Sequence, residues 1–430
     1  MAQGNGRQTP RFRIERRTLD NGLRVLVQPG GEAPLVAAHM MYDVGSADEP
    51  AGRRGFAHLF EHLLFEGSEH VAKGEHFRLV QAAGGTLNGT TWFDRTNYWE
   101  TVPVGELELA LWLESDRMGW FLPALTQEKL DNQRDVVKNE RRQSYENRPY
   151  GLAVETALAR LFPAGHPYRH PTIGFMEDLD AATLTDARDW FETWYGPENA
   201  TLVIAGAVAP DAAFAAADRW FGAIPSRGAP RGDRAAATAR GEGGVVTIGD
   251  RVSAARVYLA CHAPAFPDPA FEAADVLSSL LAEGRSSRLH HDLVHERRIA
   301  AGVGASAWPL RRTGLVWIVV TGLSGVPASE LDGATREVLD RLVREGPREF
   351  ELEGARNRAR RQLVLQLDSV TQRADALAHA AVLRGDPDYL NEVFARYDAV
   401  SADDVARVSH DILAAGGPAA VHVVPEGDGR

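Results

Sequence analysis

Residues 55–70 read GFAHLFEHLLFEGSEH and contain two histidines and a glutamate in the pattern His58-x-x-Glu61-His62. Apolar residues recur around this pattern at helical spacing, so the stretch predicts an amphipathic helix that begins near Gly55. At about 100° per residue, His58 and His62 lie one turn apart on one face, and Glu61 lies on the flank of that face. All three side chains can therefore point toward one position in space.

This arrangement suits zinc chemistry. Two neutral imidazoles are good ligands for Zn²⁺, and a catalytic zinc site needs a third protein ligand and an open position for water. Glu61 is not needed as a ligand, and it is placed to take a proton from a water that the metal acidifies. The order of the three residues is that of the inverted-zincin signature. The alternative is a chance pattern on an ordinary amphipathic helix.

The third ligand is expected on a later helical pattern, QEKLDNQRDVVKNERRQSYENRPYG. Within it, Val136, Val137 and Glu140 share one face at helical spacing, so Glu140 is expected to point where the apolar residues point. An unpaired carboxylate that faces a core is costly, and a bound cation removes that cost. The alternative is that Glu140 forms a surface ion pair with Arg134 or Arg141.

Composition narrows the remaining classes of function. The chain of 430 residues has a net charge of −12 and no basic block, so nucleic acid is not expected as a partner. Cys261 is the only cysteine, so any metal must use His and carboxylate ligands. No window approaches the length of about 18 apolar residues that suggests a membrane span. The polar N-terminus predicts a cytoplasmic protein as written, and a periplasmic one if an export signal was removed.

The chain divides nearly in two. Residues 226–244 are rich in Gly, Pro, Ala and Arg, and they predict a linker between domains of residues 1–225 and 245–430. Each domain ends with an amphipathic helix, a Gly-Pro break and a β-branched strand. We interpret this as a diverged duplication of one α+β unit. The alternative is that such endings are common in unrelated domains.

Four motifs in succession resemble the insulinase/pitrilysin family of inverted-zincin metallopeptidases, which includes the mitochondrial processing peptidase. They lie between residues 16 and 206 and read HLFEHLLFEGSEH, GGTLNGTTWFDRTNYWE, QRDVVKNERRQSYENRPYG and HPYRHPTIGFMEDL. The resemblance implies an endopeptidase with one Zn²⁺ per chain, held by His58, His62 and Glu140, and with Glu61 as the general base. Gln133 stands where the family usually has a Glu that supports the zinc site, so this supporting interaction is expected to differ.

The resemblance also implies an architecture. Two homologous domains, each a mainly antiparallel sheet packed with helices, form one half of a clamshell, and the second domain lacks zinc ligands. Family members hold the substrate peptide as an added strand on a sheet edge. This mode of binding recognises the peptide backbone rather than its side chains. The implied substrate contacts are Thr86, Asn88, Gly89, Thr90 and Phe65. For Asn88 the alternative is a turn residue before glycine.

The second half departs from the family pattern. Family members carry an Arg and, seven residues later, a Tyr that contact the peptide and the transition-state oxyanion. An ungapped alignment from GRSSRL places Val294 and Ala301 there, and neither can donate a side-chain hydrogen bond. Losing one such donor costs about 2.7–4 kcal/mol. We therefore expect a heterodimer with a homologous partner that lacks zinc ligands, and the alternative is a homodimer in which Arg297 or Arg298 substitutes.

Two other classes of function stay open. One is a non-catalytic scaffold subunit of a processing-peptidase-like complex, and the other is a zinc hydrolase of non-peptide substrates. The complete set of ligands argues against the first, and the edge-strand segment argues against the second. His290, His291 and His295 are expected to be surface or packing residues rather than ligands.

Overall fold

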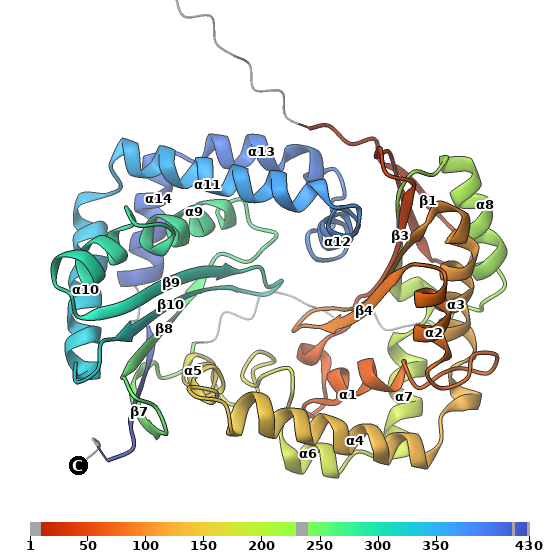
Figure 1. Cartoon of the computed structure of the whole chain (residues 1–430), viewed down its shortest axis with the longest axis horizontal. Helices are drawn as coiled ribbons and strands as arrows, with labels where there is room; N and C mark the ends of the chain where they lie inside the picture. Colours follow the sequence, from red (N-terminus) through yellow and green to blue (C-terminus); the bar gives the residue numbers. More distant parts are fainter. Residues whose placement is uncertain (1–9, 229–239, 415–417, 428–430) are drawn as a thin grey trace, which may run out of the picture.

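The computed structural model describes residues 10–228, 240–414 and 418–427. These residues form two β-sheets, each covered by helices, which lie side by side (Figure 1). The first sheet contains β1 (Glu15–Thr18), β2 (Arg24–Pro29), β3 (Leu35–Tyr42), β4 (Thr86–Thr91), β5 (Thr96–Pro103) and β6 (Ala200–Gly206). The second contains β7 (Gly244–Asp250), β8 (Arg256–Ala263), β9 (Ala300–Trp308), β10 (Gly314–Gly322) and β11 (Ala419–Pro425).

The helices fall into two sets that follow the two sheets along the chain. The first set is α1 (Phe56–Leu63), α2 (Glu75–Ala82), α3 (Leu107–Trp120), α4 (Gln127–Arg141), α5 (Ala153–Leu161), α6 (Met176–Asp180), α7 (Leu184–Trp194) and α8 (Pro210–Phe221). The second set is α9 (Phe271–Ala282), α10 (Ala328–Glu345), α11 (Glu349–Asp368), α12 (Val370–His379), α13 (Tyr389–Ala399) and α14 (Ala402–Ser409). Short π-helical segments include η4 (Arg142–Glu146), η6 (His290–Glu296), η7 (Ala380–Arg384) and η8 (His410–Ala414).

The two sheets share one topology. Without β1, the order of the first sheet is β2-β6-β3-β5-β4, and the order of the second is β7-β11-β8-β10-β9. In each sheet the first strand pairs in parallel with the last, and the other pairs are antiparallel. The predicted fold class, two homologous and mainly antiparallel α+β domains, is confirmed. The domain limits at residues 225 and 245 stay a prediction, and residues 229–239 of the predicted linker lie outside the described residues.

One helix from each half packs on the sheet of the other half, and the sequence did not predict this exchange. Helix α5 packs on β8 and β11, whereas α12 packs on β3, β5 and β6. In Figure 1, α12 lies between the two sheets. Both contacts are apolar, because Leu158 and Leu161 of α5 join the buried cluster of the second sheet and Leu377 of α12 joins Met41 and Val203 of the first. The two halves therefore share their hydrophobic cores.

Strand β3 shows why the sequence permits a helix on both faces of the first sheet. Its residues LVAAHMMY are buried along almost the whole strand, as expected of a central strand covered on both sides. Because side chains alternate between faces, Ala37, His39 and Met41 share the face toward α12. The alternate residues, among them Met40 and Tyr42, pack in the core of the first half.

Strand β9 is not predicted by the hydrophobic pattern. Its sequence AAGVGASAW contains glycine and alanine where a strand usually carries β-branched residues, and most of its residues are only partly buried. Within the part of the chain that the structure describes, it forms one edge of the second sheet, and β10 is its strand partner. Pairing with a strongly apolar neighbour, rather than its own propensity, therefore makes this segment a strand.

A polar cluster fixes α12 on the first sheet. Asp375 of α12 accepts a hydrogen bond from Asn97 at 3.3 Å, and its Oδ1 lies 3.2 Å from both His39 Nε2 and His379 Nδ1. Burial tends to raise the pKa of Asp375, but the neighbouring His379 and His39 outweigh it and hold the pKa well below 3.8. The carboxylate therefore stays charged at the contact between the halves.

Replacing Asp375 with Asn is expected to destabilise the chain at pH 7 by about 1–2 kcal/mol, a value reduced because the side chain is 36% exposed. A pKa that is lowered on folding gives stability that is complete above the unfolded value of 3.8 and is lost as the pH falls through the folded value. Urea unfolding should therefore separate the two proteins at pH 7, and the difference should shrink progressively as the pH falls below 3.8 and through the folded pKa. Equal unfolding free energies at pH 7 would show that the cluster contributes nothing.

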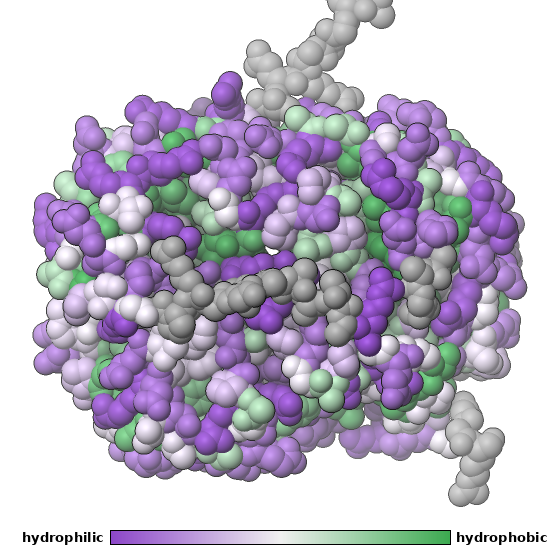
Figure 2. Space-filling view, turned by 180° about the vertical axis from the view of Figure 1, so that it is seen from behind, coloured by the Kyte–Doolittle hydropathy of each residue, from purple (hydrophilic) through white to green (hydrophobic). Residues whose placement is uncertain are grey.

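No helix among the described residues is long and apolar enough to cross a membrane. Figure 2 shows a face dominated by hydrophilic residues, with a recess near its centre. The hydrophobic residues visible on this face are scattered or lie near the recess.

Candidate metal centre

Helix α1 is held at its first turn by a buried carboxylate. Glu49 accepts hydrogen bonds from the backbone N–H groups of Gly55 at 2.9 Å and Ala57 at 2.8 Å, and its Oε2 lies 2.8 Å from His170 Nε2. Gly55 has φ of +92°, and a Cβ there would lie 2.4 Å from the carbonyl oxygen of Ile173. A negative group at a helix N-terminus also opposes the helix dipole favourably. The start of α1 is thus fixed in place.

The two faces of α1 have different surroundings. Phe56, Leu59, Phe60 and Leu63 are buried in the core of the first half, where Phe60 contacts the rings of neighbouring aromatic residues. The opposite face carries the three residues of the predicted pattern, which are all partly buried: His58, Glu61 and His62. The apolar face therefore orients the polar face, as the sequence predicts.

Helix α4 brings Glu140 to this polar face. The prediction that Glu140 shares an apolar helix face with Val136 and Val137 is partly wrong. Val137 is fully buried, but Val136 is 41% exposed, so the two valines do not share an apolar face. Glu140 lies beside the histidines rather than pairing with arginine. The alternative partners are occupied elsewhere, since Arg134 contacts Asp131 and Arg141 contacts Glu155.

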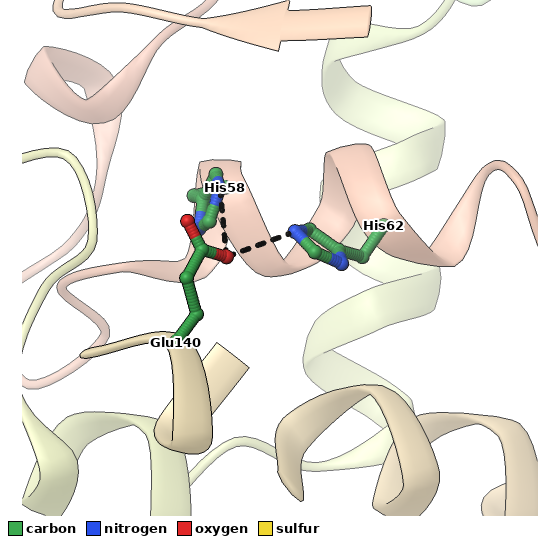
Figure 3. A group of neighbouring side chains, drawn as sticks. All are labelled: His58, His62 and Glu140. Carbon is green, nitrogen blue, oxygen red and sulfur yellow. Dashed lines mark ion pairs between the residues drawn. The ribbon is translucent and has the colours of Figure 1, made fainter. Parts of the chain in front are cut away.

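Three potential ligand atoms converge at this point (Figure 3). Oε2 of Glu140 lies 3.8 Å from His58 Nε2 and 3.5 Å from His62 Nε2. The three ligand atoms all lie within 4.8 Å of one another. Ligands at the usual zinc distances in a tetrahedral site are about 3.3–3.6 Å apart. The donor set therefore fits Zn²⁺, and the two carboxylate–imidazole separations lie within a few tenths of an ångström of this spacing.

The protonation states of His58 and Glu140 also fit a metal site. Burial and the neighbouring His62 lower the pKa of His58 to about 4, so this imidazole is neutral at pH 7, as a ligand must be. Burial tends to lower the pKa of His62, but the hydrogen bond to Glu140 and the charge of Glu61 raise it overall. The same hydrogen bond lowers the pKa of Glu140. Glu140 is therefore ionised at neutral pH.

Glu61 lies beside the ligands and is held by the edge strand. Thr91 of β4 donates a hydrogen bond from Oγ1 to Oε2 of Glu61 at 2.6 Å. Burial raises the pKa of Glu61, and the Thr91 hydrogen bond and the charge of His62 only partly offset this. A carboxyl group with a raised pKa is better matched to accepting and returning a proton near neutral pH.

Strand β4 is an edge strand that runs next to α1. It pairs only with β5, so its other edge has no strand partner among the described residues. Thr86, Asn88 and Thr90 are exposed along it, whereas Gly89 is buried. Asn88 Oδ1 accepts a hydrogen bond from the Gly89 N–H at 2.9 Å. The strand that carries these residues thus contacts α1, the helix of the two histidines, and the amide of Asn88 is partly engaged by its own backbone.

Phe65 lies beneath β4 rather than free in solution. A Cβ on Gly89 would come within 3.0 Å of Phe65 Cε2 and of Tyr98 Cδ1, so glycine permits the strand to pass close over both rings. The Phe65 ring also packs against Phe77 and Tyr98. Phe65 therefore supports the strand.

Gln133 connects the ligand His62 to a buried carboxylate. Its Nε2 donates a hydrogen bond to Glu66 Oε1 at 2.7 Å, and its side chain also hydrogen-bonds His62 and raises the pKa of that imidazole. Glu66 pairs in turn with Lys73 at 2.6 Å. The structure thus places Gln133 where a residue that orients a ligand is expected.

In the segment of the second half that departs from the family pattern, one of the two arginines that could substitute for the missing donor is held in ion pairs, whereas the other, Arg298, is exposed. Val294 lies on η6 and Ala301 lies on β9. Arg297 forms ion pairs with Asp292 at 2.6 Å and Glu337 at 2.7 Å. A homodimer that used Arg297 would have to break both ion pairs.

Comparison with known proteins gives matches along most of the chain. A family model described as insulinase (peptidase family M16) matches residues 24–174, and one described as the peptidase M16 inactive domain matches residues 181–359. The zinc protease PqqE of Helicobacter pylori is 28% identical over 398 residues, which cover 92% of this chain and 89% of that protein. An Arabidopsis thaliana protein described as a probable mitochondrial-processing peptidase subunit beta is 23% identical, over 92% of this chain and 75% of that protein.

Solved structures agree with these matches. The crystal structure of a protease from Helicobacter pylori has a TM-score of 0.88 and 25% identity, and the match covers 96% of this chain and 100% of that chain. An M16-like peptidase from Alicyclobacillus acidocaldarius shares the fold, with a TM-score of 0.83 at 20% identity over 97% of this chain and 100% of that chain. With the inverted motif on α1, these findings show that the chain belongs to the insulinase family, peptidase family M16, and has the length of its half-size members.

Proposed function

We propose that this chain is the zinc-binding subunit of a zinc-dependent endopeptidase. The observation that carries the proposal is the convergence of His58, His62 and Glu140, with Glu61 beside them. These residues fall in the part matched by the insulinase model, whereas the description "inactive domain" applies to residues 181–359. Relatives named zinc proteases also support a peptidase.

In this proposal His58, His62 and Glu140 hold one Zn²⁺. A bound zinc ion lowers the pKa of water and polarises a substrate carbonyl. Glu61 accepts the proton of the attacking water and returns it to the leaving amine. Thr91 donates its hydrogen bond to Oε2 of Glu61, so Oε1 is the oxygen with more capacity left to take this proton. Gln133 keeps His62 oriented through its contact with Glu66.

The proposed substrate is an extended peptide that adds to the edge of β4. An unpaired strand edge presents backbone N–H and C=O groups that a peptide can satisfy. The exposed Thr86, Asn88 and Thr90 lie along this strand, and Phe65 supports it from beneath at Gly89. Binding of this kind depends on the peptide backbone more than on its side chains.

Methylating one backbone nitrogen of a substrate peptide is therefore expected to raise KM more than replacing the side chain of the same residue by Ala. One lost hydrogen bond is worth about 0.5–1.5 kcal/mol, or about 2-fold to 12-fold in affinity. A series of peptides with single N-methyl groups, assayed for KM, should show alternate sensitive positions, because only every second residue of a strand bonds to a given edge. A series without alternation would argue against strand addition.

We also propose that the active enzyme is a heterodimer with a homologous chain that supplies the missing Arg and Tyr but lacks the zinc ligands. The chain alone is expected to be at least about 10²-fold less active than the pair, because each missing oxyanion donor costs about 10²–10³ in rate. Measuring kcat/KM with and without such a partner checks this. A partner whose Arg and Tyr are both replaced by Ala is the control, and full activity of the chain alone would contradict the proposal.

A further inference from the structure

A second group of metal-binding side chains lies on the second half. On η6, the imidazoles of His291 and His295 and the carboxylate of Glu296 place one ligand atom each within 4.8 Å of the others. We infer that these three residues, the η6 trio, form a surface site for a transition-metal dication such as Zn²⁺. The inference does not rest on the proposed peptidase function, and it reverses the expectation that His291 and His295 are merely surface residues.

The geometry of the η6 trio resembles that of the first centre. Oε1 of Glu296 lies 3.1 Å from His295 Nδ1 and 3.7 Å from His291 Nε2. These separations bracket the spacing of about 3.3–3.6 Å between ligands of a tetrahedral zinc site. The two imidazole rings stack with centroids 5.7 Å apart, so small side-chain rotations can bring both nitrogens to one ion. The helical backbone fixes the i, i+4 spacing of the histidines in advance.

The charges nearby leave Glu296 available to a cation. Arg297, the next residue, is bound to Asp292 and Glu337, and Arg341 is bound to Asp292 at 2.6 Å. Among the described residues, the ion pairs of Glu296 are those with the two histidines. A dication would thus meet one carboxylate whose negative charge no arginine neutralises.

A third group of histidine and glutamate side chains lies close together but differs from the η6 trio in its surroundings. His76, Glu100 and Glu114 also place ligand atoms within 4.8 Å of one another, but they are buried. Arg117 already donates to Glu114 at 2.6 Å and to His76 at 3.0 Å. His76 also lies 2.8 Å from Glu100, so these side chains already pair with one another and with Arg117, and we interpret the group as a buried ion-pair network rather than a metal site.

The exposure of the η6 trio allows entry from solvent. The side chains of His291, His295 and Glu296 are 62%, 72% and 58% exposed, so water can complete the coordination without rearrangement of the chain. Two imidazoles and one carboxylate favour zinc-like ions over Ca²⁺ and Mg²⁺, which prefer all-oxygen sites. The ligand class is therefore a borderline-soft dication.

The position of the trio gives the site a structural consequence. It lies in the connection between β8 and β9, which corresponds in strand order to the connection between β3 and β4 that carries the first pair of histidines. A bound ion would tie consecutive turns of η6 together just before the edge strand β9. Binding to the folded state alone raises apparent stability by mass action.

Equilibrium dialysis of the full chain against Zn²⁺, followed by metal analysis, tests the inference. The double variant His291→Ala/His295→Ala is expected to bind about one equivalent less zinc than the unmodified chain. His410→Ala is the matched control, because His410 is an exposed histidine beside Asp411 on η8 and should leave the zinc content unchanged. Thermal unfolding without metal checks that the variants are folded.

A second variant separates this site from the first centre. Glu140→Gln impairs the first centre only, so adding the η6 double substitution to it should remove a further equivalent. If the double variant binds as much zinc as the unmodified chain in both backgrounds, the inference is overturned. If zinc content falls by one equivalent in both backgrounds, the η6 trio binds zinc. This result would hold even if the first centre bound no zinc and the proposed peptidase function were wrong.

Discussion

The Glu61→Gln variant is expected to hydrolyse peptide about 10²–10⁴-fold more slowly than the unmodified chain, because that is the usual contribution of a general base. Glutamine keeps the size of the side chain and can still contact Thr91, but it cannot accept the proton. The measurement is kcat/KM for an unstructured peptide in the presence of the partner chain. Zinc content should stay unchanged, since Glu61 is not one of the converging ligands.

The matched control for this result is Glu75→Gln. Glu75 is a solvent-facing glutamate of the same half, on α2, where it pairs with Arg78. Its substitution should leave both kcat/KM and zinc content unchanged. A Glu61→Gln variant with activity close to that of Glu75→Gln would remove Glu61 from the mechanism, whatever the metal content.

Loss of a zinc ligand is expected to lower peptide hydrolysis as strongly as Glu61→Gln does, because less zinc is bound. His62→Ala removes one of three ligand atoms, and the zinc dissociation constant should rise by more than about 100-fold, because losing a mere supporting partner of a ligand costs 10–100-fold. Activity should fall in parallel and recover in part when excess Zn²⁺ is added. Titration with a zinc-competing chelator gives the dissociation constant directly.

Glu128→Gln on α4 is the control for ligand loss, because Glu128 is exposed in the first turn of the helix that carries Glu140. It should bind zinc as tightly as the unmodified chain. An unchanged dissociation constant for His62→Ala would show that zinc binds elsewhere, and the first centre would then have to be reassigned.

Local sequence patterns predicted much of the fold because its central strands and helices are encoded by short segments of the chain. The apolar run of β3, the Gly-Pro breaks and the repeated endings of the two halves predict strands and duplication without any long-range information. The exchange of α5 and α12 could not be predicted in this way. A helix with one apolar face looks the same in sequence whether it covers its own sheet or that of the other half.

The candidate site was predictable for a related reason. His58, Glu61 and His62 lie within two turns of one helix, so helical periodicity alone brings them together. The pairing of Glu49 with His170 spans 121 residues and depends on where the chain folds back. Sequence periodicity cannot predict this pairing, although His170 lies in one of the four motifs that resemble the family.

The link from α12 to the metal centre was missed for the same reason. Arg95 donates hydrogen bonds to the carbonyl oxygen of Thr90 at 2.8 Å, and its Nε lies 3.3 Å from His379 Nε2. Thr91, the next residue of β4, holds Glu61. The second half therefore contacts the edge strand that positions the base, through residues 284 positions apart in the chain.

The most direct test of the central claim is reconstitution of chelator-treated protein, paired with its partner chain, by stoichiometric Zn²⁺. We predict that the chelator abolishes peptide hydrolysis and that about one equivalent of Zn²⁺ per chain restores it in the unmodified protein, but not in Glu61→Gln. Hydrolysis that survives complete removal of zinc, or that never appears with zinc and partner present, would contradict a zinc peptidase and favour a non-catalytic subunit.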